Sequence, residues 1–486
     1  MYTQANLNTL EQSLKEIFAG LSESKKTTVV REHLSPKVLS SRVDLQVKED
    51  GVGEEEFLAK IAEVIANSVK TDHPLFMNQM YGDQNVHAVI GDILTTVLNT
   101  SMYTYEVAPL MTLIEKECVR VLGAKIGYDP DQTDGIFTPG GSISNMMSMV
   151  LARDAKFKNA QADGLREVPA FSVFVSEQAH YSFVKGGAFL GIGGDNIIKV
   201  KADAKGVMNI LSLCNAIERE KEKNRIPLMV VATAGTTMTG VFDDIRTIHG
   251  IALAHEMWFH VDAVWGGSLL FSDKETEKLE GIELADSVSW NLHKMMGIPI
   301  VCASFLTKHP EALENSLSVV APYLFHEKEE ETGLDLGRKS VQCGRRVDAL
   351  KLWTSLQFEG EKGFADRIDK MMAQTNLLAD KISNEREMAL YCSPESPIVC
   401  FQYMSPRLTK EQLNEVNFGI RERLFKEGEI IINYSQVNDS IILRCVVSNP
   451  DITEAHLDHI IENVLMHGRI LVKEYLSSII KVKHSS

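Results

Sequence analysis

The chain has 486 residues, of which 44% are hydrophobic, and its formal net charge at pH 7 is −16. This length is too great for one small core and predicts two to four domains, while the hydrophobic fraction is typical of an ordered globular protein rather than a disordered one. The negative charge disfavours non-specific binding to nucleic acids or to an anionic membrane.

Residues 1–72 carry apolar residues at helical spacing, in two runs separated by polar and acidic stretches. The runs are Leu7, Leu10, Leu14, Ile17 and Phe18, followed by Phe57, Ile61, Val64 and Ile65. An exposed arm would show less apolar surface than this, so we expect these helices to pack on a partner subunit. The region is therefore predicted to be an N-terminal helical dimerisation segment.

Residues 73–370 alternate short apolar runs with longer amphipathic segments, a pattern that predicts an α/β domain with a mostly parallel sheet. We expect strands at 171–176, from 229 into a Gly-Thr-Thr turn at 235–237, at 258–262 and at 287–290. Each of these strands is followed by polar groups. In open α/β sheets ligands collect at the carboxyl ends of the strands, so this edge is the predicted site.

Residues 371–486 show a different order of elements. The pattern predicts a strand at 397–403, a helix at 410–426, two strands at 430–434 and 441–447, and a helix at 452–466. This order is typical of a small α+β domain, and we place its boundary near residue 370.

Lys294 follows His293 just beyond one predicted strand, and Asp262 ends the strand before it. This pair suits pyridoxal phosphate (PLP), because a lysine amine forms a Schiff base with the cofactor aldehyde and a buried carboxylate keeps the pyridine nitrogen protonated. Each residue also has an ordinary interpretation: Lys294 with His293 could be a solvated surface pair, and Asp262 could be a common strand-end residue. Only their combination with other strand-end groups points to PLP.

Three further segments supply such groups. Thr138–Asn145 places glycines and serines before a helix, where backbone N–H groups can receive a phosphate; in isolation it would be a Gly-Gly turn with a serine N-cap. His180 could stack on a pyridine ring, although a lone histidine is more often structural. The Gly235–Thr237 turn can supply a hydroxyl to the ring face.

The chain resembles the group II PLP-dependent decarboxylases, and within them the branch of glutamate, cysteine sulfinate and aspartate decarboxylases. The resemblance runs from about His73 to Pro450 and includes the long segments His73–Gln79, Asn99–Pro109 and Val341–Asp348. It implies the PLP-dependent transferase-like fold of aspartate aminotransferase type I, with helices on both faces of the sheet. It also implies α-decarboxylation, and a homodimer with active sites at the interface.

The resemblance also implies residue roles. Lys294 would be the Schiff-base lysine, Asp262 the partner of the pyridine nitrogen and His180 the ring-stacking histidine, and these three would be catalytic. The other implied cofactor-binding residues are Gly141, Ser142, Thr237, Asn291 and His293. Arg444 matches the arginine that receives the substrate α-carboxylate; its alternative is a surface arginine, but a guanidinium among apolar neighbours needs an anion partner. No metal is expected.

Four residues bear on the substrate: Gln79, Tyr81, Ser101 and Tyr103. Glutamate decarboxylases carry Asn and Phe where this chain has Ser101 and Tyr103, whereas cysteine sulfinate and aspartate decarboxylases carry Ser and Tyr, with a bulky aromatic where Tyr81 stands. A larger residue at the floor of the substrate pocket leaves room for a side chain one methylene shorter. We therefore expect cysteine sulfinate or aspartate, giving hypotaurine or β-alanine, with glutamate giving 4-aminobutyrate as the alternative.

Two features depart from the family pattern. Leu292 replaces the usual proline before the His-Lys pair, a change that the backbone should tolerate. The loop His326–Asp335 lacks the family tyrosine that protonates the substrate α-carbon across the dimer interface. We expect His180, Lys294 or His326 to deliver this proton, or decarboxylation coupled to oxidation or transamination. A non-catalytic relative that keeps the fold is disfavoured by the complete set of site residues.

The seven cysteines show no spacing typical of a metal site, and several lie in apolar runs. They are expected to be reduced, buried thiols. Residues 1–7 lack a basic region followed by an apolar one, and no stretch approaches the length of a membrane span. The sequence therefore predicts a cytoplasmic protein.

Overall fold

A computed structural model describes residues 3–24, 27–326 and 333–485. It separates into two compact units: a large unit of residues 84–379 and 391–399, and a small unit of residues 1–83, 380–390 and 400–486. The domain limits expected from the sequence, at 1–72, 73–370 and 371–486, stay predictions.

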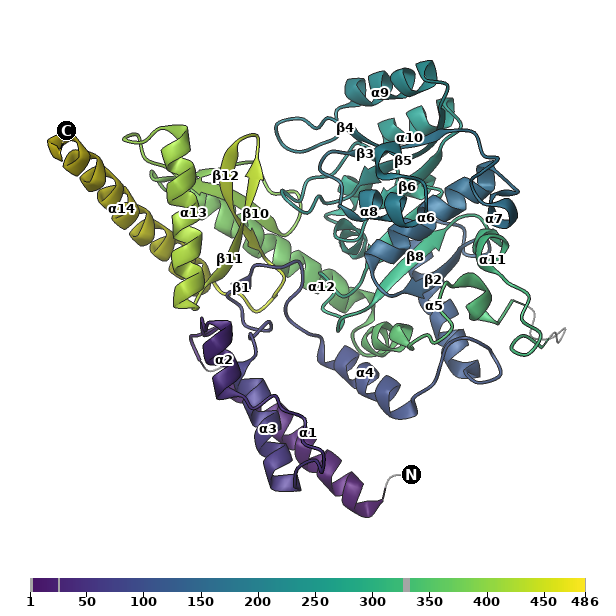
Figure 1. The fold of residues 1–486 in the computed structure, drawn as a ribbon, viewed down its shortest axis with the longest axis horizontal. Helices are drawn as coiled ribbons and strands as arrows, with labels where there is room; N and C mark the ends of the chain where they lie inside the picture. The colour runs from purple at the N-terminus through teal and green to yellow at the C-terminus, as the bar shows by residue number, and fades with distance from the viewer. Residues whose placement is uncertain (1–2, 25–26, 327–332, 486) are drawn as a thin grey trace. The chain divides into compact units, whose positions relative to one another are not determined.

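The large unit is built on a sheet whose seven described strands run in the order β2, β8, β7, β6, β5, β3, β4 (Figure 1). Their bounds are β2 Asp134–Thr138, β3 Phe171–Ser176, β4 Ile197–Val200, β5 Ile226–Thr233, β6 Trp258–Asp262, β7 Ser287–Asn291 and β8 Ala303–Thr307. β8 pairs antiparallel with β2 and β7, and the other neighbours pair parallel. The predicted mostly parallel sheet is confirmed, with the expected strands in place.

Helices cover both faces of this sheet. α6 (Gly141–Lys156) packs on the face that carries His260 and Asp262, where Asn145 contacts both side chains. α10 (Ile245–Ala254) packs on the opposite face, with the His249 ring 5.6 Å from that of Phe259. Successive strand residues point to opposite faces, which is why one strand serves both helices. The other helices of this unit are α4 Val86–Leu98, α5 Pro109–Ile126, α7 Ala160–Asp163, α8 Ser182–Phe189, α9 Ile210–Glu222 and α11 Ala312–Leu317, and α12 Asp348–Asn384 ends in the small unit.

The small unit holds a second sheet in the order β1, β11, β12, β10, β9. Its elements are β1 Phe76–Met77, β9 Met388–Leu390, β10 Ile398–Tyr403, β11 Ile431–Val437 and β12 Ser440–Val446, with α13 Lys410–Glu427 and α14 Glu454–Ser485. The strands and helices expected in the tail are confirmed. β1 was not expected there: it pairs parallel with β11, so an early segment of the chain joins the sheet of the C-terminal region.

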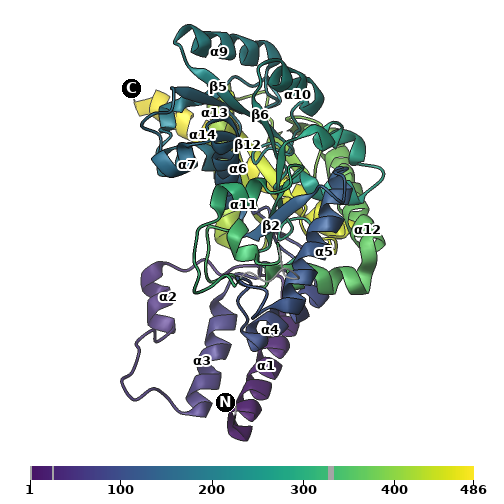
Figure 2. The ribbon, with the colours of Figure 1, turned by 90° about the vertical axis from the view of Figure 1, so that its right-hand side faces the viewer.

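The two predicted N-terminal helices are confirmed as α1 Gln4–Ser24 and α3 Glu54–Asn67, and a short helix that was not predicted, α2 Pro36–Arg42, lies between them in the sequence. α1 and α3 lie side by side in both views (Figures 1 and 2), and Gly20 leaves room for Ile65, whose Cγ2 would lie 3.0 Å from an added Cβ. Large apolar side chains on the pair stay exposed, including Phe18 at 49% and Val64 at 60%. Their packing on a partner subunit stays a prediction.

Candidate functional site

The carboxyl ends of β5, β6 and β7 bring Thr233, Asp262 and Ser289 into register, with all three side chains on the face covered by α6. Asp262 is 1% exposed. Its Oδ2 accepts a hydrogen bond from Asn145 Nδ2 at 2.9 Å, and its Oδ1 accepts one from the Val264 N–H at 3.2 Å. The predicted strand-end carboxylate is therefore buried and held by two donors.

His180 lies beyond the end of β3, close enough to the other two predicted catalytic residues for their charges to change its pKa. Burial lowers its pKa, the Lys294 ammonium lowers the pKa further, and the Asp262 carboxylate opposes them. The Ser182 N–H lies 3.3 Å from His180 Nδ1. The structure thus brings His180, Asp262 and Lys294 together, with a neutral imidazole favoured.

The turn after β7 carries Lys294. The Lys294 N–H bonds to Asn291 O at 3.3 Å, and the Gly297 N–H bonds to Lys294 O at 3.1 Å. His293 Nδ1 lies 3.0 Å from Cys302 N and 2.7 Å from Cys302 O, and burial lowers the pKa of His293 to about 4. His293 therefore attaches this turn to the backbone at the start of β8.

The start of α6 lies against Asn291. Gly140 has φ 109°, a conformation that favours glycine, and a Cβ on Gly141 would lie 2.7 Å from Val264 Cγ1 and 2.9 Å from Asn291 Oδ1. The first N–H groups of the helix, those of Gly141 and Ser142, have no partner within a helix, so they suit an anion. Among the described residues, the buried Asn291 Oδ1 and Thr233 Oγ1 have no hydrogen-bond partner.

Three residues at this edge were not identified from the sequence: Asn145, Thr233 and His260. Strand alternation could have found His260, which lies two residues before Asp262 on the same face. Thr237, in contrast, is exposed in its turn. The neighbouring Thr236 is buried, and its Oγ1 lies 3.0 Å from Thr239 Oγ1.

Ser101 and Met102 are bound by Arg345, and Tyr103 contacts Phe325 and Gly337. The Arg345 N–H bonds to Ser101 Oγ at 3.3 Å, and the Met102 N–H bonds to Arg345 O at 3.0 Å. The Arg345 side chain is buried and donates to Glu115 Oε1 at 2.6 Å and to Met102 O at 2.8 Å. The Tyr103 ring stacks 5.3 Å from that of Phe325. Two segments that carry the family resemblance therefore contact each other.

Arg444, Gln79 and Tyr81 belong to the small unit. Arg444 lies on β12, is 5% exposed, and burial lowers its pKa. Among the described residues no carboxylate pairs with it, and its Nε has no hydrogen-bond partner. Tyr81 is half-buried, with its ring 5.9 Å from that of Phe76, and Gln79 is exposed.

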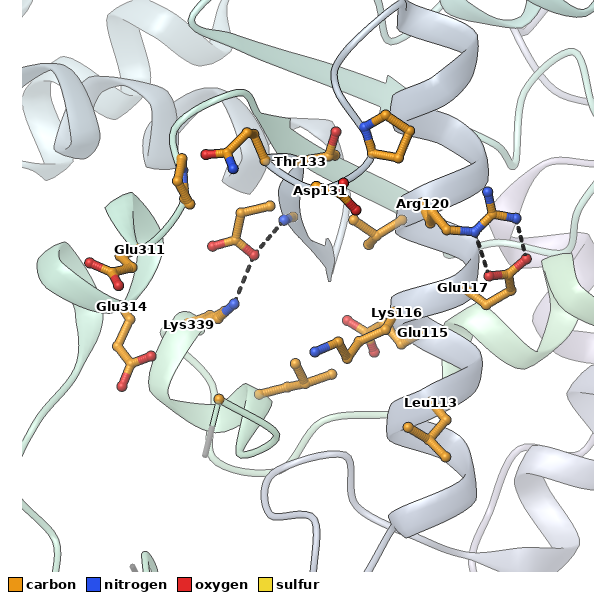
Figure 3. Close-up of a pocket in the computed structure, with 18 residues that line it drawn as sticks. Leu113, Glu115, Lys116, Glu117, Arg120, Asp131, Thr133, Glu311, Glu314 and Lys339 are labelled. Atoms are coloured by element: carbon orange, nitrogen blue, oxygen red, sulfur yellow. Dashed lines mark hydrogen bonds and ion pairs between the residues drawn. The ribbon is translucent and has the colours of Figure 1, made fainter. Parts of the chain in front are cut away.

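A cavity of about 560 Å³ lies in the large unit at the amino end of β2, away from these strand ends (Figure 3). Lys116 and Lys339 point into it, and Lys339 Nζ donates to Asp134 Oδ1 at 2.8 Å. It includes none of the predicted site residues.

Of the predicted loop, residues 327–332 lie outside the described residues, while His326 Nδ1 lies 3.2 Å from Glu106 Oε2. The described part of the chain contains no group of three or more His, Cys, Asp or Glu side chains able to hold a metal. None of its helices combines the length and the apolar character needed to cross a membrane.

The sheet order, a lysine on a strand-end turn and a buried carboxylate on the neighbouring strand define a PLP-dependent enzyme of the α/β class. The family described as "Pyridoxal-dependent decarboxylase conserved domain" matches residues 36–404. The chain belongs to this family and is a PLP-dependent amino-acid decarboxylase. The resemblance inferred from the sequence is confirmed.

Similar proteins cover almost the whole chain. Cysteine sulfinic acid decarboxylase of Mus musculus is 38% identical over 466 residues, 94% of each chain, and that of Homo sapiens is 38% identical over 463 residues, 93% of each. Acidic amino acid decarboxylase GADL1 of Xenopus tropicalis is 37% identical over 91% of this chain and 88% of its own. A crystal structure of mouse CSAD has a TM-score of 0.90 at 36% identity, over 94% of this chain and 98% of that one.

The residues present fit pyridoxal phosphate, the cofactor of this family. Gly141 lies so close to Val264 and Asn291 that only a glycine fits there, the Asn291 Oδ1 is buried and unpartnered, and the helix start supplies N–H groups suited to a phosphate. Asp262 is an acceptor able to face a protonated ring nitrogen, and Lys294 carries an amine of the kind that binds the aldehyde. The fit rests on these donors and acceptors.

Proposed function

We propose that the chain decarboxylates cysteine sulfinate or aspartate in preference to glutamate. The observation that carries this proposal is the 38% identity, over 94% of the chain, to an enzyme named for cysteine sulfinic acid. Ser101, whose Oγ accepts from the Arg345 N–H, and Tyr103, whose backbone O accepts from the Gly337 N–H, support it. The products would be hypotaurine or β-alanine and CO₂.

Each predicted site residue has a proposed task. When bound, pyridoxal phosphate supplies the electron sink for the pair released with CO₂. Lys294 provides the amine that attaches to its aldehyde, Asp262 holds a proton on the ring nitrogen, and His180 packs on the ring. The phosphate and the rest of the cofactor are held by Gly141, Ser142, Thr237, Asn291 and His293.

Arg444 is the proposed receiver of the substrate α-carboxylate. A buried guanidinium without a carboxylate partner among the described residues is costly, and an anionic substrate removes that cost. Holding the carboxylate fixes which bond at the α-carbon breaks. Gln79, Tyr81, Ser101 and Tyr103 would line the rest of the substrate site.

The substrate proposal is tested by kcat/KM for cysteine sulfinate, aspartate and glutamate with the PLP-loaded enzyme. We expect one of the first two acids to exceed glutamate by about tenfold or more, since one methylene is worth about 1–3 kcal/mol. A higher value for glutamate would refute the preference but not the decarboxylase class.

A second candidate reaction is decarboxylation coupled to oxidation or transamination. It is favoured by the absence of tyrosine between Leu324 and Asp335, where the family carries its proton donor. Without that donor the α-carbon carbanion lives longer, unless His180, Lys294 or His326 protonates it. Aldehyde and ammonia under air, or loss of active cofactor under nitrogen, would support this candidate; stoichiometric amine under both gases would exclude it.

We also propose a cytoplasmic homodimer with active sites at the subunit interface. The support is the exposed apolar surface of α1 and α3, together with Val86, Ile90 and Val97 on α4 at 61%, 48% and 50% exposure. Light scattering at micromolar concentration tests it, and a monomeric mass would contradict it.

A further inference from the structure

Behind Asp262 lies a buried network of hydrogen bonds formed by residues of β6, β7 and α6. Trp258 Nε1 donates to Ser287 Oγ at 2.9 Å, and Ser287 Oγ lies 2.9 Å from His260 Nδ1. His260 Nε2 lies 3.3 Å from Asn145 Oδ1, and Asn145 Nδ2 donates to Asp262 Oδ2 at 2.9 Å. Ser287, His260, Asn145 and Asp262 are each at most 1% exposed.

The donor and acceptor in each of these hydrogen bonds can be assigned from the two ends of the network, the Asp262 carboxylate and the Trp258 indole N–H. A carboxylate only accepts, so the Asn145 atom facing Asp262 must be the amide nitrogen, which leaves Oδ1 as the acceptor facing His260. His260 must then carry its proton on Nε2 and accept at Nδ1 from the Ser287 hydroxyl, which in turn accepts from the Trp258 indole. All donors therefore point toward Asp262.

His260 stays neutral in this arrangement. It is completely buried, and burial lowers its pKa to about 4. His260 therefore adds no second buried ion beside Asp262, which would carry its own desolvation cost.

Asn145 is also connected, through Ser182, to His180, the residue proposed to pack on the cofactor ring. Its Nδ2 donates to Ser182 Oγ at 3.0 Å, and the Ser182 N–H faces His180 Nδ1 at 3.3 Å. One amide therefore connects the residue assigned to the ring nitrogen with the turn that orients the residue assigned to the ring face.

We propose that Asn145 is a positioning residue of the decarboxylase: it holds Asp262 as an oriented hydrogen-bond acceptor for the cofactor ring nitrogen and ties the His180 turn to it. The inference rests on the proposed role of Asp262. It goes beyond that role because it assigns the orientation of Asp262 to the neighbouring side chain of Asn145.

The test compares Asn145→Leu, which keeps the volume but removes the amide, in the wild-type and in the Asp262→Asn background. Two readouts are taken on each protein: the dissociation constant for pyridoxal phosphate added to apoprotein, and the pH midpoint of the visible absorbance of the bound cofactor. Ser148→Ala is the matched control, because Ser148 is buried on the same helix and its hydroxyl donates to the Asn145 backbone O at 2.7 Å.

We expect Asn145→Leu to weaken cofactor binding about 10- to 100-fold and to shift the absorbance midpoint, because hydrogen bonds to charged groups are the strong ones. In the Asp262→Asn background the same change should alter the dissociation constant by no more than about threefold. Ser148→Ala should change neither readout. A role in packing alone predicts equal factors in both backgrounds.

Asn145→Asp is the second variant, since it keeps the shape and places a carboxylate against Asp262. We expect binding at pH 7.5 to be weaker than in Asn145→Leu, because like charges at this distance repel. Equal factors in the two backgrounds, or no effect of Asn145→Leu, would overturn the inference alone. If Asp262→Asn itself leaves both readouts unchanged, the proposed role of Asp262 is wrong and the inference fails with it.

Discussion

Arg444 and Arg345 are both buried, at 5% and 2% exposure. The same substitution at each should nevertheless change the stability of the protein in opposite directions. Arg345 forms an ion pair with Glu115 at 2.6 Å and donates to two backbone carbonyls. Arg444 has no carboxylate partner among the described residues, and burial opposes its charge. We predict that Arg345→Met destabilises the substrate-free protein and that Arg444→Met stabilises it.

The size of each change in the free energy of unfolding depends on whether the arginine has a counterion. Removing Arg345 leaves the Glu115 carboxylate buried at 1% exposure, a loss that typically costs about 3–5 kcal/mol. Removing Arg444 abolishes a buried charge with an unsatisfied donor, so the free energy of unfolding should rise by about 1–3 kcal/mol. The same Arg444 variant should lose about 2–5 kcal/mol of transition-state binding, which is roughly a 30-fold to several-thousand-fold loss of kcat/KM.

The assay is urea unfolding of the two variants and the wild type, each loaded with cofactor and without substrate, beside kcat/KM for cysteine sulfinate. Adding cysteine sulfinate should raise the unfolding midpoint of the wild type more than that of Arg444→Met, because only the wild type binds the acid tightly. If Arg444→Met lowers stability by more than about 1 kcal/mol without substrate, Arg444 has a structural partner and the reasoning is wrong.

Three further predictions can be checked independently. Lys294→Ala should abolish turnover and the lysine-linked cofactor, and borohydride reduction with peptide mapping should place the label on Lys294; label elsewhere would contradict the assignment. Combining Ser101→Asn, Tyr103→Phe and Tyr81→Ala should raise the kcat/KM ratio of glutamate to cysteine sulfinate by about tenfold, and an unchanged ratio would show that these positions do not set it. Burial lowers the pKa of His260 from its ordinary 6.5 to about 4, so the unfolded chain binds the proton more readily and stability falls as pH drops from 6.5 toward 4, by up to about 3 kcal/mol. The urea midpoint at pH 7 and pH 5 should therefore differ less in His260→Gln than in the wild type, and equal differences would refute the assignment.

Most of the sheet could be predicted because its strands are short apolar runs that end in polar groups. The runs at 171–176 and 258–262 match β3 and β6, and the run at 287–290 is one residue shorter than β7. β1 escaped prediction because a two-residue strand has no periodicity of its own and exists only through pairing with β11, more than 350 residues later.

The residues of the candidate site also divide into those with a local sequence signal and those defined by long-range contacts. Lys294 and Asp262 carry their own local signals at strand ends, so the sequence identified them. Asn145 was predicted only as part of a phosphate-binding segment, because nothing local to it indicates an acceptor 117 residues away. His260 could have been found by strand alternation, but its hydrogen-bonding direction depends on Asn145.

The two arginines show why burial and residue type do not by themselves identify a functional charge. Apolar neighbours around Arg444 predicted that it needs an anion, and Arg345 is equally buried. What separates them is the counterion: Arg345 finds Glu115, 230 residues earlier in the chain, whereas the described chain supplies none for Arg444. A buried charge paired within the chain contributes to the fold, because its partner is present in every folded molecule. A buried charge that the chain leaves unpaired reduces stability until a ligand arrives, so retaining Arg444 is explained only if the ligand brings the missing anion.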